Sequence, residues 1–291
     1  MTSTIPIASG LIARSMSEAR GICRPALRLL SMGWGVQTWT LAAMMALDEH
    51  PRADFLVFAD THHEGSGTYD FREKWTPWLG EHGLRTVTVE ATRTEAVRED
   101  WGASGAVMIP AFTVDGKTGS EGQVRRQCTH DWKITPIRHW IREELTRRGV
   151  KATPGAVECW QGISWDEALR MRTSDVKYIT NVYPLVDLRM TRMDCITWLE
   201  AHGLSVPPKS ACTFCPFKSS VAWQDLKRQG GADWQEAVAV DLAVREKRAQ
   251  QHGLLYLHPA RKPLAEAVAI PEDVGAHQGE LDFCEGGYCM T

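Results

Sequence analysis

Two cysteines separated by two residues are the chain's clearest chemical signal. Cys212 and Cys215 stand in the sequence Pro-Pro-Lys-Ser-Ala-Cys-Thr-Phe-Cys-Pro-Phe, so one short loop can present two thiolates to a metal ion or an iron–sulfur cluster. Cys128 stands far upstream in Arg-Arg-Gln-Cys-Thr, and Cys284 and Cys289 fall within the last eight residues. This distribution predicts a soluble enzyme that carries a thiolate-bound centre.

The composition is that of an ordinary globular protein. The chain has 291 residues, of which 43% are hydrophobic and 24% charged, which is enough for one large α/β domain or two small ones. A net charge of −3 gives no electrostatic argument for binding nucleic acid or a membrane surface. Residues 1–24 are predicted to form a flexible arm, because they lack the apolar core of an export signal. The eight cysteines are therefore expected in the reducing cytoplasm, where they more often serve metal binding or catalysis.

Strand and helix patterns alternate along the chain from residue 25. Strands are predicted over residues 27–31, 55–59, 85–89 and 157–163. Helices are predicted over residues 36–47, 68–79, 132–148, 191–202 and 233–251. This alternation predicts an α/β fold with a doubly wound, mostly parallel sheet. We expect one domain over residues 25–230, followed by a helical extension and a cysteine-bearing tail over residues 231–291.

Two polar loops follow predicted strands, at the edge where parallel sheets bind ligands. The first runs Ser31-Met32-Gly33-Trp34-Gly35-Val36-Gln37-Thr38. Its glycines allow close backbone approach, and its polar groups at a helix N-terminus can donate hydrogen bonds to phosphate, although a plain strand–helix turn would look similar. The second runs Asp60-Thr61-His62-His63-Glu64, where a strand-end carboxylate can hold Mg²⁺ or bind ribose. Its two histidines are expected to be solvated or hydrogen-bonded surface groups rather than metal ligands.

Basic residues surround Cys128 in the sequence. Arg125, Arg126, Lys133 and Arg138 could bind the charge of a phosphate or a sulfate. The same pattern is typical of a solvated helix face, so the residue types leave both interpretations open.

Taken together, these segments resemble the phosphoadenosine-phosphosulfate (PAPS) reductase family of the adenine-nucleotide α-hydrolase-like (PP-loop) superfamily, in its phage and prokaryotic iron–sulfur type. Ser31–Thr38 resembles the family's phosphate loop, Ser-Phe-Gly-Gly-Gly-Val-Gln-Ser. Ala59-Asp60-Thr61, followed by Glu64 and Thr68-Tyr69, resembles its Asp-Thr-Gly-x-Glu block. Gln127-Cys128-Thr129 with Lys133, Pro136 and Ile137 resembles its Cys-Cys-x-x-x-Lys-x-x-Pro-Leu block. The stretch from Tyr183-Pro184-Leu185 to His202-Gly203-Leu204 resembles the segment before its final Cys-x-x-Cys.

The resemblance implies cofactors and site residues. It implies a 4Fe–4S cluster on Cys128, Cys212 and Cys215, with Cys284 as the candidate fourth ligand and zinc as the alternative metal. It implies an adenine nucleotide, such as ATP, bound with Mg²⁺ by Ser31, Gly33, Gly35, Gln37, Thr38, Asp60, Thr61 and Arg126. The catalytic candidates are Asp60, Lys133 and Cys289.

Departures from the family pattern leave the reaction open. Gln127 replaces the first cysteine of the Cys-Cys pair, so either a tail cysteine completes the ligand set or one iron stays open, as in PP-loop thiolation enzymes. The favoured hypothesis is ATP-dependent sulfur transfer through adenylation of the substrate. The alternatives are a sulfonucleotide reductase with Cys289 or Cys284 as its nucleophile, and a non-catalytic nucleotide- or Fe–S-binding regulator.

The expected partners follow from these hypotheses. An adenine nucleotide would act with a sulfur donor or an external thiol reductant, and the acceptor is a nucleobase, a nucleic acid or a small metabolite. No membrane partner is expected, since no apolar run approaches the roughly 18 residues needed to span a bilayer. The oligomeric state stays open, with a homodimer as one option.

Overall fold

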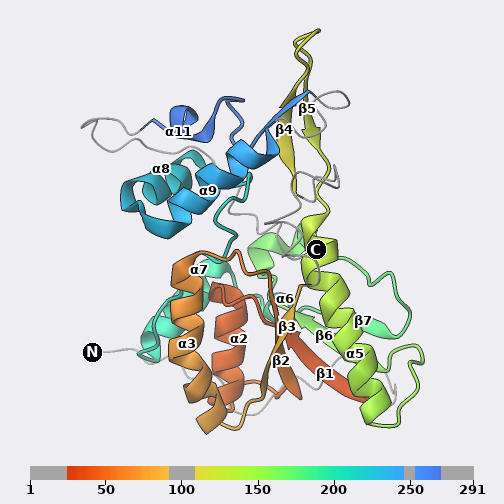
Figure 1. Cartoon of the computed structure of the whole chain (residues 1–291). Coiled ribbons are helices and arrows are strands. Elements are labelled where there is room, and N and C mark those ends of the chain that lie inside the picture. The colour runs from red at the N-terminus through yellow and green to blue at the C-terminus, as the bar shows by residue number, and fades with distance from the viewer. Residues whose placement is uncertain (1–24, 92–108, 246–252, 270–291) are drawn as a thin grey trace. The chain divides into compact units, whose positions relative to one another are not determined.

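The computed structural model describes residues 25–91, 109–245 and 253–269, which belong to two compact units (Figure 1). Unit 1 comprises Met1–Phe58, Arg72–Val87 and Trp140–Pro207, and unit 2 comprises Ala59–Phe71, Thr88–His139 and Pro208–Thr291. The chain therefore passes from one unit to the other several times. The expected N-terminal arm and the end of the tail lie outside the described residues.

A five-stranded sheet forms the centre of unit 1, with the strand order β3-β2-β1-β6-β7. The strands are β1 (Leu27–Ser31), β2 (Phe55–Asp60), β3 (Thr86–Glu90), β6 (Val157–Gln161) and β7 (Ile179–Val182). Strand β1 runs parallel to β2 and β6, and β6 runs parallel to β7. All residues of β1 and β2 are buried, as expected for strands that are covered on both faces. The predicted α/β fold is therefore confirmed.

Helices connect these strands and lie on both sides of the sheet (Figure 1). They are α2 (Val36–Ala46), α3 (Ser66–Glu81), α5 (Thr135–Arg147), α6 (Pro184–Asp187) and α7 (Arg192–Ala201), with a 3₁₀ turn at η2 (Trp165–Arg170). The helices predicted in these regions are confirmed, with small shifts at their ends. Gly203 follows α7 with a φ of 67°, which a glycine adopts without steric cost. None of the described helices is long and apolar enough to cross a membrane.

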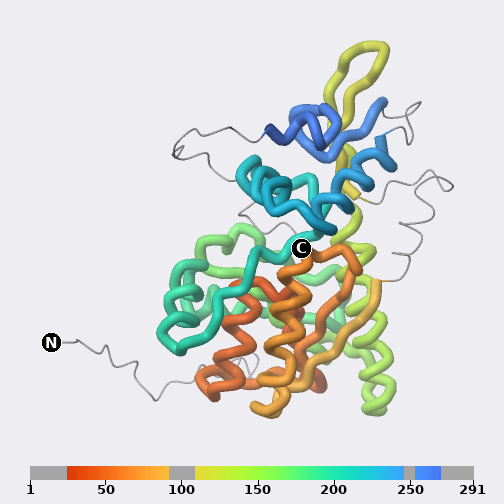
Figure 2. The backbone as a smooth tube through the Cα atoms, turned by 60° about the vertical axis from the view of Figure 1, so that its left-hand side comes forward, coloured from red at the N-terminus to blue at the C-terminus, as the bar shows by residue number. Residues whose placement is uncertain are grey.

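Unit 2 is built on a small antiparallel sheet with the order β5-β4-β8. Its elements are β4 (Ala111–Val114), β5 (Glu121–Val124), β8 (Leu254–Tyr256), the π-helix η1 (His130–Ile134), α8 (Ser220–Gln229), α9 (Gly231–Val244) and α11 (Leu264–Ala267). Figure 2 shows the yellow β4–β5 hairpin beside the blue C-terminal segment, far away in the sequence. Sequence patterns missed this hairpin because three of the four residues of β5 are exposed and carry no apolar alternation.

The core of unit 2 packs α8 and α9 against the small sheet. Trp132, Phe214, Trp223, Ala237 and Leu255 are among its buried members. Two of the cysteines predicted to bind metal, Cys128 and Cys212, pack against this same core. The segments that carry the cysteines are therefore held by unit 2 itself.

Asp241 ties together the C-terminal part of unit 2. Its side chain is 1% exposed, pairs with Arg245, and accepts hydrogen bonds from the backbone N–H groups of Leu257 at 3.1 Å and Leu264 at 2.9 Å. Replacing Asp241 with alanine should lower the free energy of unfolding by about 3 kcal/mol, because a partly buried arginine and two backbone amides lose their partner. Chemical denaturation followed by circular dichroism measures this loss.

A surface ion pair offers the matched control for that measurement. Asp225 and Arg228 on α8 lie 2.6 Å apart with both side chains about half exposed. Asp225→Ala should change the stability by no more than about 1 kcal/mol. Equal losses in the two variants would contradict the structural role given to Asp241.

Candidate metal centre and nucleotide loop

The Cys-x-x-Cys segment folds into a tight turn in unit 2. The backbone N–H of Cys215 donates to the carbonyl of Cys212 at 3.1 Å, and Lys218 N–H donates to the carbonyl of Cys215 at the same distance. Phe214, between the two cysteines, is 1% exposed and anchors the turn in the core of the unit. Both thiols are half-buried, so the turn presents them together at the surface of that core.

The loop that follows β2 pairs with this turn. Glu64 and Cys212 form an isolated antiparallel β-bridge, in which Thr213 N–H donates to the carbonyl of His63 at 2.8 Å. The hydroxyl of Thr61 lies 3.7 Å from the sulfur of Cys212. The loop after β2 and the Cys-x-x-Cys turn, which lie far apart in the sequence, therefore pair directly with each other.

Helix α9 holds both segments through Glu236. Its carboxylate contacts Nδ1 of His63 at 2.8 Å and accepts a hydrogen bond from the hydroxyl of Thr213 at 2.8 Å. The His63 ring also packs edge-on against Phe214, with 4.9 Å between the centroids. His63 is thus a buried, hydrogen-bonded residue, whereas His62 is exposed and adopts a left-handed backbone conformation with a φ of 59°. His62 is a surface residue, as the sequence analysis expected, whereas the expectation of a surface position is wrong for His63, because its ring packs in the core of the unit.

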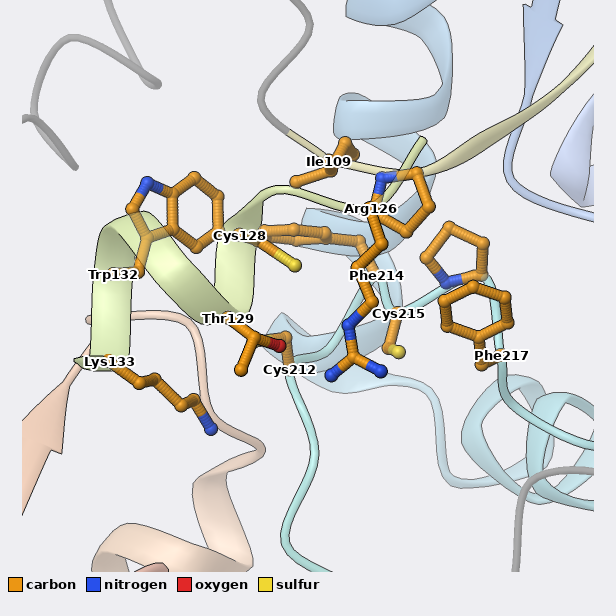
Figure 3. A pocket seen from close by; sticks show the side chains of 12 residues that line it. Ile109, Arg126, Cys128, Thr129, Trp132, Lys133, Cys212, Phe214, Cys215 and Phe217 are labelled. Carbon is orange, nitrogen blue, oxygen red and sulfur yellow. The ribbon is translucent and has the colours of Figure 1, made fainter. Parts of the chain in front are cut away.

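One pocket of unit 2 collects the three cysteines predicted to bind metal (Figure 3). Cys128 enters it from the segment before η1, and Cys212 and Cys215 enter it from the tight turn. The rest of its lining is mostly apolar and includes Ile109, Pro110, Trp132, Phe214, Pro216 and Phe217. Within the described ranges, no group of three or more His, Cys, Asp or Glu side chains is arranged to hold a metal ion. The structure thus shows a shared pocket for the thiols and not a preformed single-ion site.

Two of the predicted basic residues line this pocket. The Arg126 guanidinium lies over the Phe217 ring, 5.6 Å from its centroid. Lys133 lies in the π-helical turn η1, a rare element that often occurs at functional sites, and its Nζ pairs with the fully buried carboxylate of Glu64 at 2.8 Å. Arg125 and Arg138 do not contribute to the lining in the described part of the chain.

Thr129 also lines the pocket, and the sequence analysis did not single it out. It is buried, and its hydroxyl has no hydrogen-bond partner among the described residues, a situation that costs about 1–3 kcal/mol for a buried polar group. Gln127, in contrast, is exposed. The motif spacing contains the signal that was overlooked. Counted back from Lys133 and Pro136, the Cys-Cys pair of the family block falls on Cys128 and Thr129.

Asp60 ends β2 as predicted and is nearly buried. Its Oδ1 accepts hydrogen bonds from the hydroxyl of Tyr69 and from the backbone N–H of His62, both at 2.8 Å. Burial, together with the hydrogen bond and the charge of Asp60, raises the pKa of Tyr69 far above its ordinary value. Tyr69 therefore stays a hydrogen-bond donor that fixes the orientation of the Asp60 carboxylate.

The candidate phosphate loop lies in unit 1, between β1 and α2. The sheet order runs outward in opposite directions from β1 and β6, which makes this the switch point where such sheets bind ligands. Within the loop, Gly33 N–H donates to the hydroxyl of Thr38 at 3.3 Å. The buried Trp34 adopts the left-handed backbone conformation, with a φ of 56°. Gly35 does not, since its φ is −87°.

Residues after β6 complete the surroundings of this loop. A Cβ atom at Gly162 would stand 2.4 Å from the methyl carbon of Thr38, so that only glycine allows this close approach. The side-chain amide of Gln37 donates to Glu167 at 3.4 Å, and Arg192 donates to the amide oxygen of Gln37 at 3.3 Å. Burial raises the pKa of Glu167, and the charge of Arg170 opposes that shift. Sequence reasoning missed these charged neighbours because they lie far from the loop along the chain.

The remaining cysteines fall into two groups. Cys159 and Cys195 are buried in unit 1, and burial raises the pKa of the Cys195 thiol to about 12, so both side chains pack as core residues. Cys284 and Cys289, like Cys23, lie outside the described residues, and the family resemblance gives a role only to Cys284 and Cys289. Their roles as ligand and nucleophile stay predictions.

Comparison with known proteins adds little beyond this description. No family model and no curated protein matches the chain. Among solved structures, it is similar to the U34-tRNA thiolase NcsA from Methanococcus maripaludis with its [4Fe-4S] cluster, with 11% identity, a TM-score of 0.39, and coverage of 91% of this chain and 82% of that chain. A similarity of this size does not extend to function. The fold and the sites themselves define an α/β protein with a polar loop at the switch point of its sheet and a three-cysteine pocket.

Proposed function

We propose that the protein is a PAPS-reductase-like enzyme of the PP-loop superfamily that uses ATP and an iron–sulfur centre to replace a substrate oxygen with sulfur. One observation carries this proposal. Cys128, Cys212 and Cys215, which are distant in the sequence, line the same pocket of unit 2.

The chemistry of the pocket fits a thiolate-bound metal centre. Soft thiolate ligands suit iron–sulfur clusters and zinc, and an apolar lining limits the access of water. Phe214 and Phe217 supply part of that lining, while Arg126 supplies positive charge next to the thiols. When bound, an iron–sulfur cluster on the three cysteines would supply a place to hold sulfur for transfer.

The nucleotide is assigned to the loop of unit 1. Ser31, Gln37 and Thr38, together with the first amides of α2, would bind the phosphates of ATP at a helix N-terminus. The substrate oxygen would attack the α-phosphorus and release pyrophosphate. A sulfur nucleophile at the oxidation level of sulfide would then displace AMP, which keeps the substrate oxygen. Both steps are substitutions and require no external reductant.

Product analysis distinguishes this function from its alternatives. The protein is purified without oxygen, and its iron, labile sulfide and zinc are measured before incubation with ATP, sulfide and candidate acceptors. Pyrophosphate and AMP formed together with a thiolated product support the proposal. Release of sulfite from a sulfonucleotide would instead identify the protein as a sulfonucleotide reductase. Stoichiometric zinc without sulfide would refute the iron–sulfur centre. Nucleotide binding without any product would favour the third alternative, a non-catalytic nucleotide-binding regulator.

Asp60 should act in Mg²⁺-dependent nucleotide binding and not in folding. Asp60→Asn keeps the shape of the side chain but removes its charge, so the affinity for Mg–ATP should fall by about tenfold or more. Titration calorimetry with and without Mg²⁺ measures this change. Asp225→Asn, which removes the same charge from an exposed ion pair on α8, is the control and should bind as the wild type does. Full affinity and full turnover in Asp60→Asn would exclude Asp60 as a magnesium ligand.

A further inference from the structure

Exposed apolar side chains gather on one part of unit 1. Nine large hydrophobic side chains are exposed in the described part of the chain, and five of them fall between residues 165 and 193. These five form the η2 patch: Trp165 (49% exposed), Leu169 (95%), Met171 (39%), Leu188 (40%) and Met193 (65%). Single exposed hydrophobic residues are normal on a protein surface, whereas a contiguous group of them indicates an interaction site.

Hydrogen bonds hold the elements that carry the η2 patch side by side. Trp165 N–H donates to the carbonyl of Met190 at 2.8 Å, and Arg192 N–H donates to the carboxylate of Asp166 at 3.1 Å. The guanidinium of Arg189 lies 5.9 Å from the centroid of the Trp165 ring. The turn η2, the end of α6 and the start of α7 therefore present one surface.

The turn η2 gains little from packing within its own chain. It has six residues, from Trp165 to Arg170, and none of them is buried. Helical segments in proteins owe most of their stability to the packing of an apolar face, and so short a segment depends on such packing most strongly. The apolar side chains of η2 are therefore expected to pack against a partner.

The area of the η2 patch fits one side of a protein–protein interface. A fully exposed side chain of this size has roughly 200 Å² of surface, so the five exposed fractions together amount to about 600 Å². Stable interfaces bury about 800 Å² on each partner. The patch thus supplies most of the area that a stable dimer needs, and a polar rim can supply the rest.

Charges of both signs border the η2 patch. Four exposed charged residues stand next to patch residues in the sequence: Arg172, Arg189, Asp187 and Asp194. In a two-fold contact the same surface meets itself, so a rim of one sign would repel its own copy, whereas a mixed rim can form pairs. The acidic residues oppose binding to the phosphates of nucleic acid or of a lipid surface, and the whole chain has a net charge of −3. The patch is therefore suited to a second copy of this chain.

We propose that the η2 patch is the interface of a homodimer, in which two copies of the chain meet through the same surface. Trp165 and Leu169 bury their side chains against the partner copy, and the charges of the rim pair across the two-fold axis. The inference is independent of the proposed function, because it requires neither a metal centre nor a nucleotide.

The proposed interface shares its elements with the surroundings of the candidate phosphate loop. Glu167 of η2 accepts a hydrogen bond from the side-chain amide of Gln37 at 3.4 Å, and Arg192 of α7 donates to the amide oxygen of Gln37 at 3.3 Å. Dimer formation would therefore fix the two elements that hold Gln37 at the start of α2.

Sedimentation velocity of the full chain over a range of concentrations tests the inference. The wild type should form a species with twice the chain mass of 32.5 kDa at micromolar concentration. Leu169→Glu and Met193→Glu each bring two charges into the apolar interface, one from each copy, so the Kd of the dimer should rise by about tenfold or more. Both positions are exposed in the single chain, so the fold should be unchanged, which circular dichroism checks.

Leu242→Glu is the matched control, because it makes the same change at a residue of α9 in unit 2 that is 68% exposed. It should dimerise as the wild type does. A wild type that stays monomeric would contradict the inference and leave the patch to another occupant, such as residues 1–24 or a different protein. Unchanged dimer affinity in both patch variants would also contradict it, because another surface would then form the dimer.

Hydroxyl-radical footprinting locates the interface without any substitution. Trp165 and Met193 are exposed and belong to residue types that oxidise readily. Both should be labelled several-fold more slowly in the concentrated dimer than in the diluted monomer. Equal labelling of both residues in the two samples would show that the η2 patch does not form the interface.

Discussion

Cys212→Ser and Cys215→Ser should each leave the purified protein with almost no iron or labile sulfide. The two thiols come from one tight turn in the pocket that Cys128 also lines, so loss of either should disrupt the ligand set. Wild-type protein prepared without oxygen should contain about four iron and four sulfide per chain if the cluster is of the 4Fe–4S type. Iron and sulfide analysis, together with the visible absorption spectrum, measures the difference.

The control for this experiment is another cysteine of the same chain. Cys195 is fully buried in α7 of unit 1, so Cys195→Ala should keep the wild-type iron content per folded molecule. Cys128→Ser should behave like the two variants of the turn. Retention of iron and sulfide in all three serine variants would show that the pocket does not hold the cluster.

Gly162→Ala should weaken both nucleotide binding and unit 1. The added Cβ would stand 2.4 Å from the methyl carbon of Thr38 and 3.0 Å from its backbone nitrogen, so the start of α2 has to move. Overpacking of this kind typically costs about 1–3 kcal/mol. Because the same helix start is assigned to the phosphates, the affinity for ATP should fall by about tenfold or more. Denaturation and titration calorimetry measure the two effects.

A second substitution tests the physical cause. Thr38→Ser removes the methyl group that the new Cβ would approach and keeps the hydroxyl that accepts from Gly33 N–H. Combined with Gly162→Ala, it should restore part of the lost stability, so the effects of the two changes should not add. Gly80→Ala provides the control, since a Cβ there would meet no atom within 4 Å. Strict additivity in the double variant would show that the two residues do not compete for space.

The main helices and strands of unit 1 could be predicted because their signals are local. β1 and β2 consist mostly of apolar residues, and Gly203, shortly after α7, adopts the left-handed conformation that is common after a helix end. The short strands of unit 2 could not be predicted in this way. β5 and β8 have four and three residues, too few to show a period, and they form because β4 pairs with both.

The candidate site also combines features that short sequence segments determine with features that depend on the whole fold. The sequence by itself determined which residues could bind metal, since the Cys-x-x-Cys spacing and the thiol chemistry of Cys128 are properties of short segments. Only the tertiary structure decided that Glu236 holds the loop after β2 against the cysteine turn, and that Cys128 lines the same pocket as Cys212 and Cys215. Burial and long-range hydrogen bonds depend on the path of the whole backbone, and no local pattern of residues encodes that path.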